Sequence, residues 1–219
     1  MRKKWIYLAC LLAGAVVWNA TPAYAQTDLA TSIDGFFSGK TESGTPLTGK
    51  DVQSPSDSAG GLLEVRHIHN ALVGFEAAYS YHRANQTYTY TIPANAPTTP
   101  CTSSGCNTLP VTTVVSANAH TIVGDWVLSR KKRSLRYFAL AGGGVLFVVP
   151  SGGQMYTGTA TEFVFECGIG LDWELASHFG LRLQDRANIY SAPNLNTFST
   201  ATGDLTYTQE PALGIYYRF

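Results

Sequence analysis

Apolar and polar residues alternate along eight segments of the chain, and the alternation is clearest between Thr161 and Glu174. There, apolar side chains occupy every second position from Phe163 onward, while Glu166 and Asp172 lie among the positions between them. A period of two places the two sets on opposite faces of a β-strand. The same period predicts strands over eight ranges: Thr31–Gly39, Leu62–His69, Ala71–His82, Ala117–Ser129, Leu135–Val149, Thr161–Glu174, Phe179–Tyr190 and Tyr207–Phe219.

The last of these segments has one apolar and aromatic face, formed by Leu213, Ile215, Tyr217 and Phe219. In this ending the chain resembles the small OmpA/OmpX-type outer-membrane β-barrel proteins of Gram-negative bacteria. Their assembly machinery recognises a terminal Phe and an aromatic residue two positions earlier, and Phe219 and Tyr217 stand at these two places. The resemblance implies an all-β, porin-like fold: an eight-stranded antiparallel up-and-down transmembrane β-barrel. It implies the barrel assembly machinery, outer-membrane lipids and lipopolysaccharide as partners.

The connections between the predicted strands alternate in length. Three short turns follow the second, fourth and sixth strands. Four long segments, rich in Pro, Ser, Thr, Asn and Gly, separate the others: Lys40–Gly61, Arg83–Ser116, Pro150–Ala160 and Ser191–Thr206. Short periplasmic turns and long extracellular loops are typical of small outer-membrane barrels. We therefore expect four solvent-exposed loops outside the cell, through which the protein would bind an extracellular partner.

The first 25 residues have the three parts of a secretory signal peptide: a basic start (Arg2, Lys3 and Lys4), an apolar run (Trp5 to Val17) and a cleavage site (Ala23-Tyr24-Ala25). We expect a signal peptide over residues 1–25 and one outer-membrane β-barrel domain over residues 26–219. The mature chain would have twelve basic and 15 acidic residues, a net charge of −3, which excludes a strongly basic nucleic-acid binder. After residue 25, no apolar run approaches the roughly 18 residues of a membrane helix.

Alternation alone does not show which face of each strand points into the barrel. A soluble periplasmic ligand-binding barrel encloses its apolar face, whereas a membrane barrel turns that face to lipid. Glycines on the polar faces and the terminal Phe219 favour the membrane arrangement. Asp185 is the exception, because it falls on the apolar face in mid-strand. A carboxylate in lipid is costly, so we expect a bulge or a register shift near this residue.

In the membrane arrangement, the polar faces place charges of both signs inside the barrel. The candidates for this lumen charge network are Glu64, Arg66, Glu76, Asp125, Arg136, Glu166, Asp172, Arg182 and Arg186, with Glu210 and Arg218 on the last strand. Side chains fill the lumen of an eight-stranded barrel, and charges buried there must be paired or hydrated. Two interpretations stay open: a plug of salt bridges that makes the barrel rigid, or a proton-sensitive gate built from the same groups.

The second long loop contains Cys101 and Cys106, with four residues between them, in a Thr-, Ser- and Pro-rich context. Because the signal peptide directs the chain to an oxidising compartment, we predict a disulfide between them. The bridge would either form a rigid recognition element or protect the loop against proteolysis. No histidine lies near the two cysteines, so a zinc site there is not expected, and no cofactor is predicted.

A lipid-A-modifying outer-membrane enzyme, either an acyl hydrolase or an acyl transferase, is the alternative function. The third strand carries Glu76, Ser80 and His82 on one face, and His120 lies at the facing end of the fourth strand. A serine nucleophile needs a base within hydrogen-bond reach. Ser80 and His82 would point into the lumen, however, and no motif of those enzyme families is matched. We therefore predict a non-enzymatic protein with a structural or surface-interaction role and no catalytic residues or metal ligands.

Overall fold

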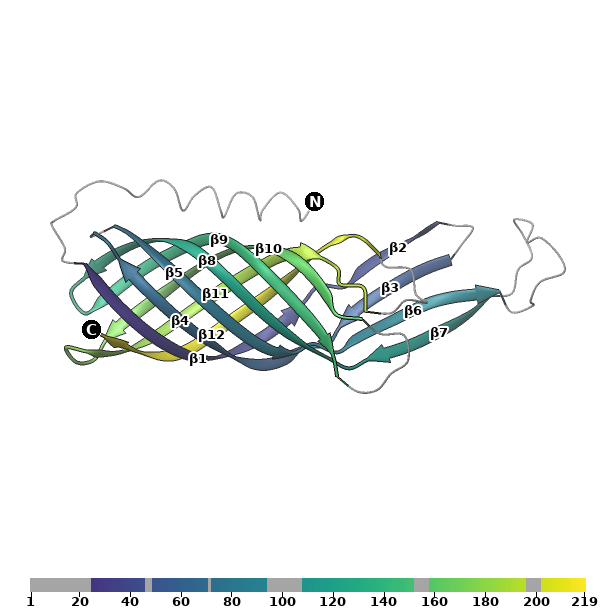
Figure 1. Cartoon of the computed structure of the whole chain (residues 1–219), viewed down its shortest axis with the longest axis horizontal. Coiled ribbons are helices and arrows are strands. Elements are labelled where there is room, and N and C mark those ends of the chain that lie inside the picture. The colour runs from purple at the N-terminus through teal and green to yellow at the C-terminus, as the bar shows by residue number, and fades with distance from the viewer. Residues whose placement is uncertain (1–24, 46–48, 71, 94–107, 152–157, 196–201) are drawn as a thin grey trace.

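The computed structural model describes residues 25–45, 49–70, 72–93, 108–151, 158–195 and 202–219. The strands in this part are β1 (Gln26–Ser38), β2 (Thr41–Thr45), β3 (Gly49–Pro55), β4 (Ser58–Ile68), β5 (Val73–Arg83), β6 (Gln86–Pro93), β7 (Thr108–Val115), β8 (Ala117–Lys132), β9 (Leu135–Pro150), β10 (Ala160–Glu174), β11 (Phe179–Ser191) and β12 (Leu205–Arg218). Eight of them close into an antiparallel barrel in the order β1-β12-β11-β10-β9-β8-β5-β4 (Figure 1). The predicted eight-stranded antiparallel barrel is therefore confirmed. Within the described ranges, no helix is long and apolar enough to cross a bilayer.

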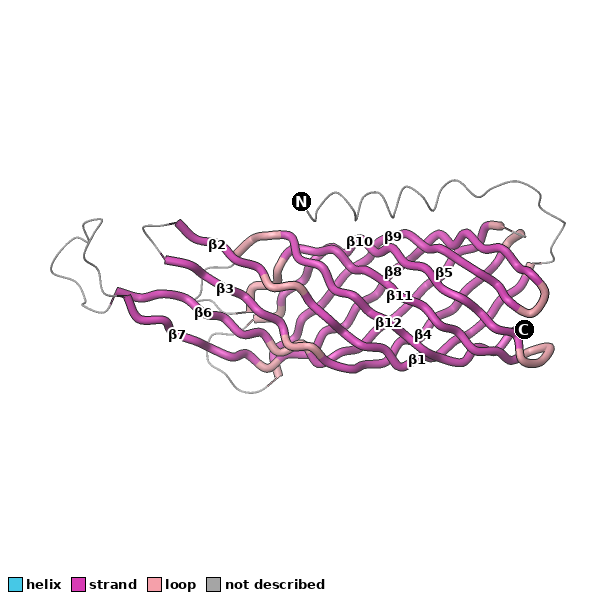
Figure 2. Tube along the Cα trace, turned by 180° about the vertical axis from the view of Figure 1, so that it is seen from behind, coloured by secondary structure: helices cyan, strands magenta, loops and turns pink. Residues whose placement is uncertain are grey.

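The remaining strands form a second sheet, ordered β2-β3-β6-β7, that extends beyond one end of the barrel (Figures 1 and 2). The prediction of loops throughout Lys40–Gly61 and Arg83–Ser116 is therefore wrong. β6 and β7 read QTYTYTIP and TLPVTTVV, and threonine, tyrosine and valine favour extended backbone. Each long segment folds back on itself as a hairpin, and the two hairpins pair through β3 and β6.

The two ends of the barrel differ. Short turns join β4 to β5, β8 to β9 and β10 to β11 at one end, where β12 also finishes; we refer to it as the turn end (Figure 1). The opposite end, from which the four-stranded sheet extends, is the loop end (Figure 2). Here β9 continues to β10 and β11 to β12 through longer connections.

The outer face of the barrel is apolar and its inner face is charged. Ile33 and Phe163 are 74% and 73% exposed, and further large apolar side chains cover the wall between them. Exposed aromatic residues gather at the turn end (Trp126, Tyr137, Trp173, Phe179, Tyr217 and Phe219) and toward the loop end (Tyr79, Tyr81 and Phe163). An apolar band between two aromatic belts suits a bilayer and its interfaces. A soluble ligand-binding barrel has the opposite arrangement, so the structure argues against that alternative.

Asp185 stays on the apolar outer face. The register is continuous on both sides of this residue, which lies opposite Ile169 of β10 and Pro211 of β12. The predicted bulge or register shift is therefore wrong. One carboxylate oxygen, Asp185 Oδ2, accepts a hydrogen bond of 2.7 Å from Gln209 Nε2 on the outer surface, whereas Oδ1 has no hydrogen-bond partner among the described residues. A neighbouring amide replaces part of the lost hydration and makes the outward position tolerable.

Candidate functional site

All nine residues proposed for the lumen charge network lie inside the barrel, each at most 6% exposed. They come from six strands: Glu64 and Arg66 from β4, Glu76 from β5, Asp125 from β8, Arg136 from β9, Glu166 and Asp172 from β10, and Arg182 and Arg186 from β11. The period of two directs them inward, and the barrel closure brings them within reach of one another.

Arg186 pairs with three glutamates from three other strands. Its Nη2 lies 2.7 Å from Glu64 Oε1 and also bonds Glu76 Oε1, while its Nη1 lies 2.5 Å from Glu166 Oε1. Asp125 is more distant, with Oδ2 3.9 Å from Nη1. One fully buried guanidinium therefore neutralises charge contributed by β4, β5 and β10. Such charge-assisted hydrogen bonds are about twice as strong as neutral ones.

Arg182 forms a second centre, two inward positions closer to the turn end. Its Nε lies 2.8 Å from Asp172 Oδ1, its Nη2 lies 2.8 Å from Asp28 Oδ1, and its Nη1 lies 3.3 Å from Glu64 Oε1. Glu64 thus receives hydrogen bonds from both Arg182 and Arg186. The shared carboxylate joins the two centres into one network.

Arg66 completes the network and packs against an aromatic ring. Its Nε lies 2.5 Å from Glu76 Oε2, and its Nη1 lies 3.4 Å from Asp172 Oδ2. The guanidinium carbon stands 3.9 Å from the centroid of the Phe138 ring, a cation–π distance. A Cβ atom on Gly170 would lie 2.2 Å from Phe138 Cζ, so this glycine makes room for the ring.

The network crosses the whole width of the barrel. Arg66 and Asp172 come from β4 and β10, and Arg186 and Glu76 come from β11 and β5; both pairs of strands are diametrically opposite in the barrel order. Side chains that meet across the centre fill the lumen. This geometry favours the interpretation as a rigid plug. A gate would need these same ion pairs to separate.

Sequence reasoning missed two acidic residues of the lumen, Asp28 and Asp34. The first strand was predicted to begin at Thr31, whereas β1 begins at Gln26. Asp28, Ser32 and Asp34 share the inward face with Ala30. The signal was weak, because Leu29 and Ile33 continue the period of two while Ala30 and Thr31 interrupt the alternation of hydrophobicity.

A cover of four residues (Gln53, Tyr88, Pro193 and Leu195) closes the loop end. Gln53 Nε2 and the Tyr88 hydroxyl donate to the Pro193 carbonyl at 2.7 and 3.0 Å, and the Leu195 amide donates to the Tyr88 hydroxyl at 3.0 Å. Leu195 and Tyr88 belong to the apolar cluster that fills this end. The connection from β11 to β12 is thereby anchored to the four-stranded sheet.

Tyr88→Phe should loosen this cover, because the Pro193 carbonyl and the Leu195 amide each lose a buried partner. We expect the free energy of opening the cover to fall by about 1–3 kcal/mol. Faster hydrogen–deuterium exchange of the Leu195 amide would report it. Exchange as slow as in the wild type would contradict the role of the hydroxyl.

The cover should also respond to pH through Tyr88, since burial raises the pKa of this hydroxyl from 10.0 to about 12. A raised pKa in the folded state means that the contribution to stability is complete below pH 10 and is lost as the pH rises toward 12. Tyr88→Phe should remove this alkaline loss.

The other predicted site residues lie apart from the lumen. Tyr217 and Phe219 stand at the turn end with ring centroids 5.1 Å apart, and Phe219 is 72% exposed. Both rings are therefore accessible from outside the barrel, and their recognition by the assembly machinery stays a prediction. Cys101 and Cys106 lie outside the described residues, so the disulfide also stays a prediction.

The residues considered for catalysis do not form one site. Ser80 and His82 are buried in the lumen, at 4% and 0% exposure, so neither side chain faces lipid. His120 pairs with Tyr81 on the outer face, where its Nδ1 lies 2.9 Å from the Tyr79 hydroxyl. His82 and His120 therefore point to opposite sides of the barrel wall and cannot bind one ion together.

No protein-family model matches the chain, and no curated protein matches it. Several solved structures of outer-membrane barrels are similar to it. Neisserial surface protein A is 11% identical with a TM-score of 0.55, covering 87% of this chain and 97% of that one. OprG of Pseudomonas aeruginosa is 10% identical with a TM-score of 0.53, covering 90% and 96%. Ail, the attachment invasion locus protein of Yersinia pestis, is 13% identical with a TM-score of 0.50, covering 90% and 100%. The fold is that of the eight-stranded outer-membrane barrels.

Proposed function

We propose that the protein is a non-enzymatic barrel of the outer membrane that presents the β2-β3-β6-β7 sheet at the cell surface for binding a partner. The observation that carries the proposal is this ordered sheet, which projects beyond a barrel whose lumen is filled (Figure 2). The turn end would face the periplasm and the loop end the exterior, as in other small barrels. The apolar wall would contact outer-membrane lipids and lipopolysaccharide.

The edges of the surface sheet suit the addition of a strand. β2 and β7 are its outermost strands, and within the described residues each pairs with a single neighbour. An extended peptide can pair with such an edge through main-chain hydrogen bonds. Threonine and valine dominate β7, which gives a neutral surface for this pairing.

The partner should bind this surface through contacts that do not depend on strongly charged groups. The segments 39–59, 83–117, 150–160 and 191–205 contain three basic residues (Lys40, Lys50 and Arg83) and four acidic residues (Glu42, Asp51, Asp57 and Asp204). The Ail structure contains the heparin analogue sucrose octasulfate. A polyanion of that kind needs a basic surface, so we do not propose it as the ligand here.

Peptides selected from a phage-displayed random library should bind the purified full chain and should lose binding when residues 86–115 are replaced by a short turn. Binding should change little between low and high salt, because screening acts on charge pairs. Immobilised heparin should capture neither protein. The matched control is the SDS gel shift between unheated and boiled samples, which the shortened variant should retain in the outer-membrane fraction. Peptide binding that survives the replacement would contradict the assignment to this sheet.

Lipid-A modification is not the function that the geometry supports. A hydrolase or transferase for a membrane lipid needs its nucleophile open to the bilayer or its interface. Ser80 instead lies within the lumen, between the network and the cover.

A further inference from the structure

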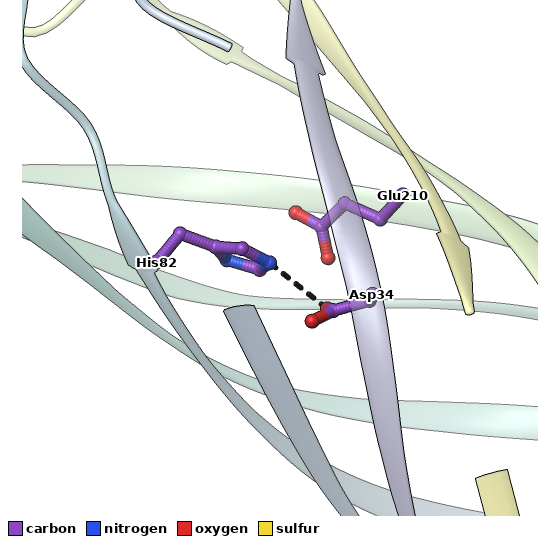
Figure 3. A group of neighbouring side chains, drawn as sticks. All are labelled: Asp34, His82 and Glu210. Atoms are coloured by element: carbon purple, nitrogen blue, oxygen red, sulfur yellow. Dashed lines mark hydrogen bonds and ion pairs between the residues drawn. The ribbon is translucent and has the colours of Figure 1, made fainter. Parts of the chain in front are cut away.

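Three buried side chains lie together on the loop-end side of the lumen charge network: Asp34 of β1, His82 of β5 and Glu210 of β12 (Figure 3). One ligand atom from each, a carboxylate oxygen or an imidazole nitrogen, lies within 4.8 Å of the other two. His82 Nε2 is 2.9 Å from Asp34 Oδ2, and the Glu210 carboxylate approaches the same imidazole edge (Figure 3). We refer to these three residues as the seam cluster, because β1 and β12 are the strands that close the barrel.

The fold holds the seam cluster in place from two sides. Asp34 pairs across the sheet with Gly60, and Gly60 pairs in turn with His82. A Cβ atom on Gly60 would lie 2.2 Å from His82 Cδ2, so the glycine lets the imidazole lie flat against β4. The Phe36 ring covers the other side, with its centroid 4.7 Å from that of His82. Glu210 of β12 is held by Asn188 of β11, whose Nδ2 donates to Glu210 Oε1 at 2.9 Å.

The seam cluster has more negative charge than its protein partners neutralise. Within the described residues, neither Asp34 nor Glu210 forms an ion pair with a lysine or an arginine, and His82 is their one cationic candidate. Asp34 Oδ1 and His82 Nδ1 are buried with no hydrogen-bond partner there. The neighbouring network offers no spare cation, because six carboxylates (Asp28, Glu64, Glu76, Asp125, Glu166 and Asp172) share four guanidiniums (Arg66, Arg136, Arg182 and Arg186). Buried carboxylates without compensation are costly, so the cluster must gain either a proton or a bound cation.

We propose that Asp34, His82 and Glu210 bind one divalent transition-metal cation, of which Zn²⁺ is the test case. One imidazole nitrogen and two carboxylate oxygens form a ligand set that Zn²⁺ accepts, at about 2.0–2.2 Å from each atom. Tetrahedral bonds of this length place ligand atoms about 3.3 Å apart, which the observed spacing reaches by small rotations of Glu210. Ca²⁺ and Mg²⁺ fit worse, because they prefer six or more oxygen ligands.

The bound ion would link the first strand, the last strand and β5. Such a link stabilises the barrel at its closing seam, because a metal that binds only the folded state shifts the equilibrium toward that state. The cluster is enclosed by Phe36, the network and the cover. The ion therefore enters as the barrel folds, and metal exchange in the folded protein should be slow.

The test is to refold the full chain from urea into detergent with Zn²⁺, with Co²⁺, with Ca²⁺ or with EDTA, and then to measure bound metal by mass spectrometry. We expect close to one Zn²⁺ or Co²⁺ per chain, a visible absorption band of four-coordinate Co²⁺, a higher temperature for the SDS gel shift, and no Ca²⁺. Asp34→Asn and Glu210→Gln should each weaken Zn²⁺ binding by at least about 10–100-fold, the loss typical even of second-shell partners. His120→Gln, which removes an exposed imidazole, should retain the bound ion.

Three results would overturn the proposal. The first is wild-type protein refolded with Zn²⁺ that contains no metal, since the cluster would then be neutralised by a proton shared between His82 and a carboxylate. The second is equal metal content in the wild type and in folded Glu210→Gln protein. The third is loss of the metal in His120→Gln. The wild-type measurement decides the question even where the lumen variants fail to fold.

Discussion

Arg186→Leu is expected to lower the free energy of unfolding by roughly 3–5 kcal/mol, enough to abolish the folded, SDS-resistant form in most preparations. The reason is the loss of one guanidinium that pairs with Glu64, Glu76 and Glu166 in the lumen. Glu64 and Glu76 would keep Arg182 and Arg66 as partners, whereas Glu166 would keep no arginine partner within the described residues, and leucine offers it no hydrogen bond. Urea unfolding in detergent, followed by the gel shift, measures the change.

A matched variant and a partial rescue make this prediction specific to buried charge. Arg130→Leu removes an exposed arginine near the end of β8 and should change the free energy of unfolding by no more than about 0.5 kcal/mol. Adding Glu166→Gln to Arg186→Leu should recover part of the lost stability, because it removes the charge of the carboxylate that has lost its arginine partner. Equal stability of Arg186→Leu and wild type would show that the network is not a structural plug.

Gly144→Ala is expected to destabilise the barrel by about 3 kcal/mol, the upper part of the usual range for overpacking. Gly144 lies in the middle of β9, paired with Val123 on one side and Val164 on the other. An added Cβ would stand 1.9 Å from the Ile122 carbonyl oxygen and 2.7 Å from the Val123 Cα. These are backbone atoms that cannot rotate away, so β8 and β9 would have to separate locally.

Gly158→Ala is the matched control for this substitution. A Cβ atom at Gly158 would meet nothing within 4 Å, and the residue lies just before β10. Its effect should stay within about 0.5 kcal/mol, measured in the same urea series. Similar stabilities for the two variants would show that β8 and β9 can move apart at little cost.

The strands of the barrel could be located from sequence to within a few residues. The prediction of Thr161–Glu174 differs from β10 by one residue, and the prediction of Phe179–Tyr190 differs from β11 by one. Both follow from a strictly local property, the alternation of side chains along an extended backbone. The start of β1 was harder to locate from the sequence. Its inward residues Asp28, Ala30 and Ser32 are small or polar, and the alternation of hydrophobicity is weak there.

The surface sheet was missed because its pairing is not local. Thr108–Val115 alternates weakly, and Gln86–Pro93 alternates threonines with Tyr88, Tyr90 and Ile92 only over a short stretch of a segment rich in polar residues and proline. Both are strands of a sheet because β6 pairs with β3, a strand from a different connection that the pairing of β4 with β5 brings beside it. A marginal hairpin is stabilised by a third strand.

The sequence by itself determined which residues share a face of each strand, since that depends on neighbouring peptide units alone. It therefore named nine charged residues of the lumen, although alternation alone did not show that their face points inward. The tertiary structure decided that this face points inward, and it decided which carboxylates meet which guanidiniums. Both depend on distances across a closed barrel. Asp34 and Glu210 lie near opposite ends of the chain, and they meet at His82 because β1 and β12 pair to complete the barrel.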